Sequence, residues 1–202
     1  MLAAMLDFLA LSIYVFVMSI TPGPNNIMVT ASGAMFGYWR TIPHLLGVSV
    51  GCAAQTVMVA AGLGVALVGY PILRNWLAWA GTGYLIYLGC RIFAADFISS
   101  QVGPRPVPLS FLEAALFQFL NPKAWMIAIT TATVFLPQGF TIVTGSALIA
   151  LVLILVNYPC ISLWALFGTA IGRFLTSAFR RRIFNGILAL ALAVTGIGML
   201  VY

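Results

Sequence analysis

Charge is what this sequence has least of. Of its 202 residues, 6% are charged, three are acidic and one is histidine, whereas 63% are hydrophobic. So few polar groups cannot cover the surface of a water-soluble globule. Several apolar runs reach the roughly 20 residues that a helix needs to cross the hydrocarbon core of a membrane. The sequence therefore predicts an all-α polytopic membrane protein.

The shortage of acidic residues and of histidine also argues against an enzyme. The three carboxylates are Asp7, Asp96 and Glu113, and the first two stand at predicted helix ends. With one histidine in the chain, they form no carboxylate pair, no Ser-His-Asp set and no metal cluster. We therefore expect no catalytic site, no bound metal and no cofactor.

Cysteines and basic residues are few as well. Cys52, Cys90 and Cys160 lie in apolar runs without the spacing of a metal site, which indicates small buried hydrophobic residues. The formal net charge of +6 comes from scattered basic residues near helix ends. Such charges predict membrane orientation, and we expect no nucleic-acid partner.

We expect six membrane-spanning segments in a single transmembrane domain, residues 1–202. The predicted spans are 6–38, 44–68, 72–94, 111–136, a stretch within 141–171, and 183–202. A proline-rich connector, 96–110, separates a first three-helix repeat, 1–95, from a second, 111–202. The loops after spans one, three and five hold seven basic residues, and the opposite side holds one. The positive-inside rule then places the connector in the cytoplasm and both termini in the periplasm.

Two of the six segments are interrupted. Thr21-Pro22-Gly23-Pro24-Asn25-Asn26 breaks the first, and Asn121-Pro122-Lys123 breaks the fourth. Proline lacks a backbone donor and glycine loses much entropy on ordering, so each segment divides into two half-helices. Three spans per half make the halves antiparallel, and the two breaks then correspond. This layout, a 3+3 inverted repeat with helices 1 and 4 interrupted, indicates a transport site near the membrane midplane.

Lys123 carries the charge that we expect deepest in the membrane. A helix that starts near Ser110 places Asn121 about 16 Å along, close to the bilayer centre. A lysine there costs about 2.5–3.5 kcal/mol, so it should face the bundle interior or water. Beside a half-helix N-terminus it suits a carboxylate, and Asn25 and Asn26 complete a site for a zwitterion. The predicted substrate-binding and translocation residues are Pro22, Gly23, Pro24, Asn25, Asn26, Gln55, Asn121, Pro122, Lys123 and Asn157.

Each of these polar residues also has a structural interpretation. Lys123 can extend towards a headgroup region. Gln55 and Gln118 can line a path or bond to a neighbouring helix. Asn157 can face the cavity or satisfy carbonyls that a kink at Pro159 frees. His44, at the start of the second span, is interpreted as interfacial or structural in preference to a proton relay.

Five motifs carry a family resemblance that covers nearly the whole chain. They are TPGPN at 21–25, PHLLG at 43–47, NPKAW at 121–125, SLWALFG at 162–168 and the stretch 180–186. On these motifs the sequence resembles the LysE/RhtB family of amino-acid exporters. The resemblance implies a small bacterial inner-membrane protein with six spans. It would export amino acids or close derivatives, driven by the proton gradient. Our own hypothesis is that export proceeds by alternating access, with the site between the two interrupted segments.

The sequence departs from the family pattern at two positions. Many members carry an aspartate in the second span and another in the fifth, where this chain has Cys52 and Asn157. Neither residue titrates as a carboxylate, so proton coupling through these sites is in doubt and a neutral amino acid is the favoured substrate. The expected partners are this small molecule and the lipid bilayer. The sequence leaves open whether the protein forms a homo-oligomer. The alternatives are an exporter of a metal ion or other small solute, and a non-transporting membrane scaffold.

Overall fold

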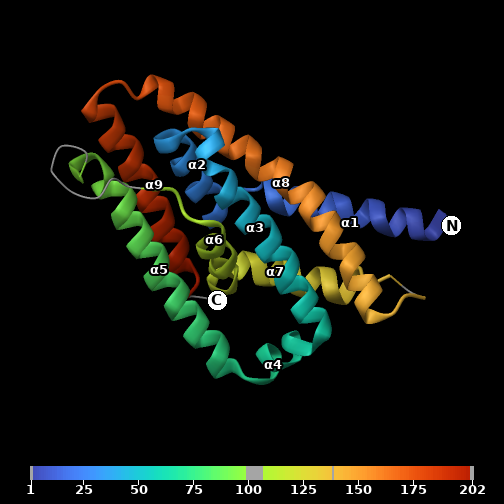
Figure 1. The fold of residues 1–202 in the computed structure, drawn as a ribbon. Helices are drawn as coiled ribbons and strands as arrows, with labels where there is room; N and C mark the ends of the chain where they lie inside the picture. The colour runs from blue at the N-terminus through green and yellow to red at the C-terminus, as the bar shows by residue number, and fades with distance from the viewer. Residues whose placement is uncertain (1, 99–106, 138, 201–202) are drawn as a thin grey trace.

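The computed structural model describes residues 2–98, 107–137 and 139–200, and helices make up nearly all of these ranges (Figure 1). The elements in order are α1 (Leu2–Ile20), α2 (Pro24–Phe36), α3 (Tyr38–Met58), a π-helical turn (Val59–Leu63), α4 (Gly64–Gly69), α5 (Pro71–Ile98), α6 (Phe111–Phe117), a 3-10 turn (Gln118–Leu120), α7 (Pro122–Val134), α8 (Ile142–Phe174) and α9 (Ala178–Gly198). Within the described ranges there is no strand. The prediction of an all-α chain is confirmed.

Both predicted breaks are present. Thr21, Pro22 and Gly23 separate α1 from α2, and the two helices are bent by 58° relative to each other. Asn121 separates the 3-10 turn that follows α6 from α7. Pro24 and Pro122 each stand in the first turn of the helix that follows, where a missing backbone donor removes no hydrogen bond.

The second predicted span begins too late. Gly37, with φ of 80°, reverses the chain between α2 and α3, so that α3 starts at Tyr38 and not at residue 44. The prediction left residues 39–43 between the first two spans, whereas they belong to α3, and Pro43 is accommodated inside this helix. α3 is followed directly by the π-helical turn, in which Gly62 has a φ of 116°.

Other boundaries differ by a few residues. α5 continues to Ile98, past the predicted end at residue 94, and 99–106 of the predicted connector lie outside the described residues. α9 starts at Ala178 and not at 183, because the Ser177 hydroxyl caps it by accepting from the Arg180 backbone N–H at 3.3 Å. Pro159 lies inside α8, which continues without a break.

Among the described residues, three helices are long and apolar enough to cross a membrane by length and composition. They are Tyr38–Leu63, which is α3 with its π-helical turn, and helices α8 and α9. The bent pair α1–α2 makes a fourth span if it is counted as one. The chain is therefore consistent with a polytopic membrane protein, and the six-span count and the 3+3 repeat stay predictions.

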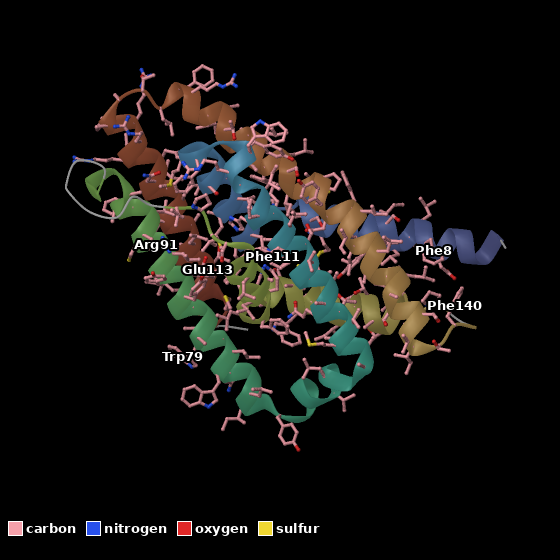
Figure 2. All side chains as sticks on the ribbon, in the orientation of Figure 1. Phe8, Trp79, Arg91, Phe111, Glu113 and Phe140 are labelled. Atoms are coloured by element: carbon pink, nitrogen blue, oxygen red, sulfur yellow. The ribbon has the colours of Figure 1, made fainter. Side chains whose placement is uncertain are left out.

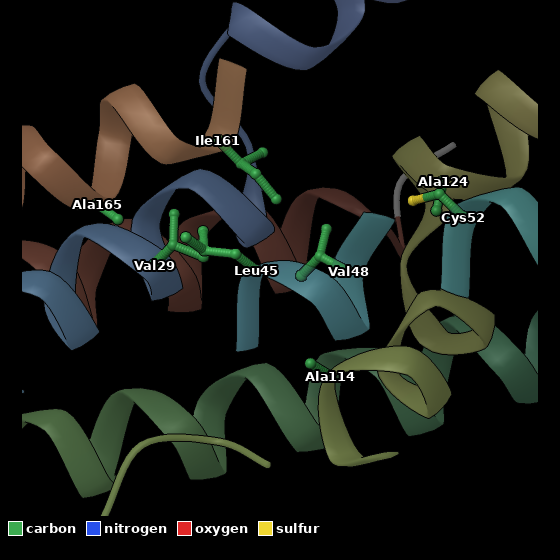
Figure 3. Packing of buried hydrophobic residues seen from close by; sticks show 8 residues of the cluster. All are labelled: Val29, Leu45, Val48, Cys52, Ala114, Ala124, Ile161 and Ala165. Carbon is green, nitrogen blue, oxygen red and sulfur yellow. The ribbon is translucent and has the colours of Figure 1, made fainter. Parts of the chain in front are cut away.

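Helices α3 and α8 lie at the centre of the packing. α8 contacts α1, α2 and α3, α3 also contacts α6 and α7, and α5 pairs with α9. Figure 1 shows α8 running alongside α1 and α2. Residues from α2, α3, α6, α7 and α8 meet in one buried cluster, drawn in Figure 3: Val29, Leu45, Val48, Cys52, Ala114, Ala124, Ile161 and Ala165.

Glycines allow the closest of these contacts. A Cβ atom at Gly33 or at Gly168 would overlap a backbone carbonyl of the facing helix in the α2–α8 contact. Gly47 and Gly51 lie in the same way against α6, where a Cβ at Gly51 would come within 2.7 Å of the Ala115 Cα. The small-xxx-small pair 47/51 therefore lets a helix approach closely, as predicted.

The cysteine prediction is correct at two positions and wrong at one. Cys52 and Cys160 are buried, and all three thiols are free. Cys90 is exposed instead, because it lies on the face of α5 that turns away from the other helices.

Candidate functional site

The two breaks meet through Lys123. Its ammonium Nζ donates to the carbonyl oxygen of Thr21 at 2.6 Å and to that of Pro22 at 3.4 Å. The Lys123 stem lies against Gly23, where an added Cβ would be 3.0 Å from Cδ. Because the C-terminal end of a helix carries partial negative charge, the ammonium caps α1 favourably.

Two further side chains donate to the same end of α1. The Asn26 amide nitrogen bonds to the carbonyl oxygens of Ser19 at 2.9 Å and of Thr21 at 3.1 Å. The Trp164 indole N–H bonds to the Ile20 carbonyl at 3.1 Å. The carbonyls of Ser19, Ile20 and Thr21 at the end of α1 are thus bound by residues of α2, α7 and α8.

A second network surrounds Gln118, which is buried just before the second break. Its side-chain amide exchanges two hydrogen bonds with that of Asn25, at 2.8 Å and 3.2 Å. The Cys52 thiol donates to Gln118 Oε1 at 3.3 Å, and the Gln55 amide donates to the Gln118 carbonyl at 3.2 Å. Gln118 therefore connects the start of α2 and the C-terminal part of α3 to the turn that follows α6. The predicted site did not include it, although a lone glutamine three residues before Asn121 was a usable signal.

The remaining predicted asparagines also bond to protein groups. Asn157 accepts from the Ser49 hydroxyl at 3.0 Å and donates to the Ser19 hydroxyl at 2.9 Å, so it joins α8 to α3 and α1. Asn121 is buried, and its oxygen accepts from the Lys123 backbone N–H at 3.1 Å, which caps α7. At α2, by contrast, the capping residue is Gly23, with no side-chain hydrogen bond.

A large cavity lies beside the breaks. It has a volume of about 830 Å³, within the usual range of roughly 300–1,000 Å³ for small-molecule pockets. Both breaks and helices α5, α7 and α9 line it. The predicted site residues on its wall are Pro22, Gly23, Pro24, Pro122 and Lys123.

A second, much smaller cavity adjoins the first at Gly23 and Lys123. At about 10 Å³ it has room for about one water molecule. The predicted residues on its wall are Gly23, Asn25, Asn26, Asn121, Lys123 and Asn157. Gly23 and Lys123 line both cavities and therefore mark the boundary between them, whereas Gln55 lines neither.

Comparison with known proteins gives the family. The model of the family described as LysE type translocator matches residues 16–202, which include both breaks and Lys123. The chain belongs to the LysE type translocator family. No solved structure matches it.

Curated relatives of this translocator share a name. A cysteine/O-acetylserine efflux protein of Salmonella paratyphi A is 31% identical over 185 residues, covering 89% of this chain and 90% of the relative. The protein of that name from Salmonella typhimurium matches with the same identity and coverage. The one from Escherichia coli O157:H7 is 31% identical over 127 residues, covering 62% of this chain and 64% of the relative.

In this LysE type translocator the family motifs meet in space. TPGPN supplies the Thr21 and Pro22 carbonyls, NPKAW supplies the ammonium of Lys123 that binds them, and SLWALFG supplies the Trp164 indole. The arrangement can bind a cation at the α1 carbonyls and an anion at the ammonium. These are the two charges of a zwitterion.

Proposed function

We propose that this translocator is a secondary transporter that exports neutral amino acids or close derivatives across the bacterial inner membrane by alternating access. The observation that carries the proposal is the contact of Lys123 with the Thr21 and Pro22 carbonyls at the wall of the 830 Å³ cavity. The relatives named for cysteine and O-acetylserine support the substrate class, since both compounds are neutral α-amino acids.

The contact of Lys123 with the α1 carbonyls supports the following mode of substrate binding. The α1 carbonyls already accept from one ammonium group, so the α-ammonium of an amino acid can take its place. The released Lys123 then pairs with the substrate carboxylate in a charge-assisted hydrogen bond. The N-terminus of α2, which has no side-chain cap at Gly23, adds backbone donors to the same carboxylate. Exchanging one ammonium for another leaves the α1 carbonyls bound at every stage.

The packing supports an inverted repeat. α8 of the second half contacts α1 and α2 of the first half, and α3 of the first half contacts α6 and α7 of the second half. α3 and α8 also contact each other, and α5 contacts α9. A twofold exchange of the halves relates these contacts, as a 3+3 inverted repeat requires. Rocking of one half against the other would then expose the breaks to each face in turn.

Orientation follows if the positive-inside rule holds. The large cavity is lined by Asn75 and Trp79 near the start of α5 and by Gly198 at the end of α9. These helix ends lie away from the connector, so the cavity faces the periplasm when the connector is cytoplasmic. Both chain termini are then periplasmic, and the conformation described is the one that releases substrate.

The test is transport by the full-length chain in proteoliposomes. Vesicles are loaded with labelled cysteine, serine, O-acetylserine or lysine, and efflux is measured for the wild type, for Lys123→Met and for Met126→Leu. Met126 lines the same cavity from the same helix without a polar group, so it is the matched control. We expect efflux of the neutral substrates, about a tenfold or larger loss with Lys123→Met, and little change with Met126→Leu. Unchanged efflux with Lys123→Met would exclude this site, and no efflux of any amino acid by the wild type would exclude the function.

A further inference from the structure

A third cavity lies at the connector end of the molecule. It measures about 70 Å³ and is lined by α2, α3, α5 and residues 107–109. Ser32, His44 and Arg91 contribute its polar side chains. A cavity needs roughly 10–15 Å³ to hold one water molecule, so this one has room for several. It shares no lining residue with the two cavities at the breaks.

His44 is the unusual residue of this cavity. It is the chain's single histidine, and its side chain is 1% exposed. Neither ring nitrogen has a hydrogen-bond partner among the groups that the structure describes. Buried polar atoms nearly always have partners, so a purely structural histidine would bond to a neighbouring helix. An unpartnered imidazole beside a cavity with room for water instead suits exchange of a proton with that water.

A charged group of α6 acts on this imidazole. Glu113, in the first turn of α6, interacts electrostatically with His44 and with Arg91 of α5. Glu113 also forms a capping box with Ser110, whose backbone N–H donates to the carboxylate at 2.8 Å. Figure 2 shows Arg91 and Glu113 on their two helices. Tyr84 of α5 interacts with both of them.

The other helices packed against α3 bring no further charge to the cavity. α2 and the two irregular turns contain no titratable residue. α7 has Lys123, which lies at the breaks, and α3 itself has Tyr38, Arg40 and Cys52 outside the cavity wall. The titratable residues of α8 also lie off that wall: Tyr158, Cys160 and Arg173. Of the side chains on this wall, His44 is therefore the one whose ordinary pKa lies closest to neutral pH.

We propose that His44 is a proton-binding site that controls opening of the connector-side cavity. An imidazolium needs hydration or a paired anion in contact with it, and the ring as packed is 1% exposed and has no hydrogen-bond partner among the described groups. Widening the cavity to solvent hydrates the ring, so protonation stabilises the open conformation. By linkage, acid on the connector side shifts the population towards that conformation. The effect on transport rests on the proposed alternating access, whereas the proton site itself does not.

The single histidine allows a direct measurement. Full-length protein in lipid nanodiscs, labelled with isotopes in histidine, gives one imidazole signal by NMR. We expect this signal to titrate reversibly within the range from about pH 4 to pH 7. The titration midpoint should move in Glu113→Gln, which removes the facing carboxylate, and should stay in place in Tyr70→Phe, which alters the distant α4–α5 turn. A signal that stays constant over this range, or a midpoint indifferent to Glu113→Gln, overturns the proposal.

A transport measurement tests control of the cavity. In proteoliposomes with the pH of each face set separately, acid on the connector side should change the wild-type rate by roughly threefold or more. His44→Gln should abolish this dependence, while Met35→Leu, which alters the same cavity wall without a titratable group, should keep it. Retention of the wild-type pH dependence in His44→Gln contradicts the inference. Absence of transport in the wild type contradicts the proposed function instead, and the NMR titration then still decides whether His44 binds a proton.

Discussion

The end of α1 is held by side chains that come from three other helices. Lys123, Asn26 and Trp164 donate to its last carbonyls, and two of these residues are more than a hundred positions away in the sequence. In water such carbonyls would be hydrated. Inside an apolar bundle each unpaired carbonyl would cost several kcal/mol. The break in the first segment therefore depends on correct packing of α7 and α8.

Asn26→Ala should destabilise the fold, because it removes the amide that binds the Ser19 and Thr21 carbonyls. We expect the free energy of unfolding to fall by about 1–3 kcal/mol. The measurement is the thermal unfolding midpoint in detergent. Asn75→Ala, on the wall of the large cavity, is the control, with a change within about 0.5 kcal/mol. Equal midpoints for the two variants would show that the α1 end does not need Asn26.

The Asn25–Gln118 pair should behave as one unit. Either alanine substitution breaks both reciprocal hydrogen bonds, so the second substitution removes little more. A double-mutant cycle on unfolding should give a coupling energy of about 0.5–3 kcal/mol. Strictly additive effects would mean that the two amides do not stabilise each other.

For individual residues, the sequence predicted which side chains lie near the two breaks but not which groups they bind. Lys123 was singled out by its cost in a membrane, and Asn25, Asn26, Asn121 and Asn157 by their polarity. Their partners could not be read from the sequence, because an asparagine bonds equally well to a substrate, a serine or a helix end. Their bonds in the structure are to the protein, and their role in binding substrate stays a prediction.

At the scale of helices, proline and glycine made the breaks predictable. Their effects are local, since a missing donor or an entropy loss acts wherever the residue stands. The start of α3 was not predictable in the same way. Pro43 and an aromatic–basic pair both suggest a helix boundary, yet packing against α2 and α8 stabilises the helix from Tyr38 onwards.

The close contact of α2 with α8 can be tested with paired glycine substitutions. Gly168→Ala places a Cβ in conflict with the Thr30 backbone, so the helices must separate and the unfolding midpoint should fall. Gly83→Ala, on an open face of α5, meets nothing within 4 Å and should raise helix stability by roughly 0.5–1 kcal/mol. If Gly168→Ala were as stable as Gly83→Ala, the helices would not pack this closely.

For the whole molecule, hydropathy and composition were sufficient to predict the class, because a bilayer restricts a spanning chain to few architectures. The count of six spans goes beyond the three or four that length and apolar character support in the structure. The predicted spans that do not meet this length and hydropathy criterion are α5 and the α6–α7 pair. The first has charged residues towards both ends, and the second divides into pieces too short to cross alone.

Topology can be measured by labelling single cysteines in a chain whose three native cysteines are serine. Val107, beside the connector, and Tyr70, in the α4–α5 turn, are both exposed. Val107→Cys should react with an impermeant maleimide from the cytoplasmic face, and Tyr70→Cys from the periplasmic face. Labelling of both from one face would refute the predicted arrangement of spans.

The fixed positive charge of Lys123 has a consequence for the cell that houses this protein. A cavity of about 830 Å³ that opens to one face of the membrane would allow ions to leak across if they could pass from it to the other face. A cation that enters the large cavity meets the Lys123 ammonium at the boundary with the smaller cavity. A positive group at a constriction excludes protons and metal cations. If the proposed transport function holds, we therefore expect the protein without substrate to pass few cations and to preserve the membrane potential.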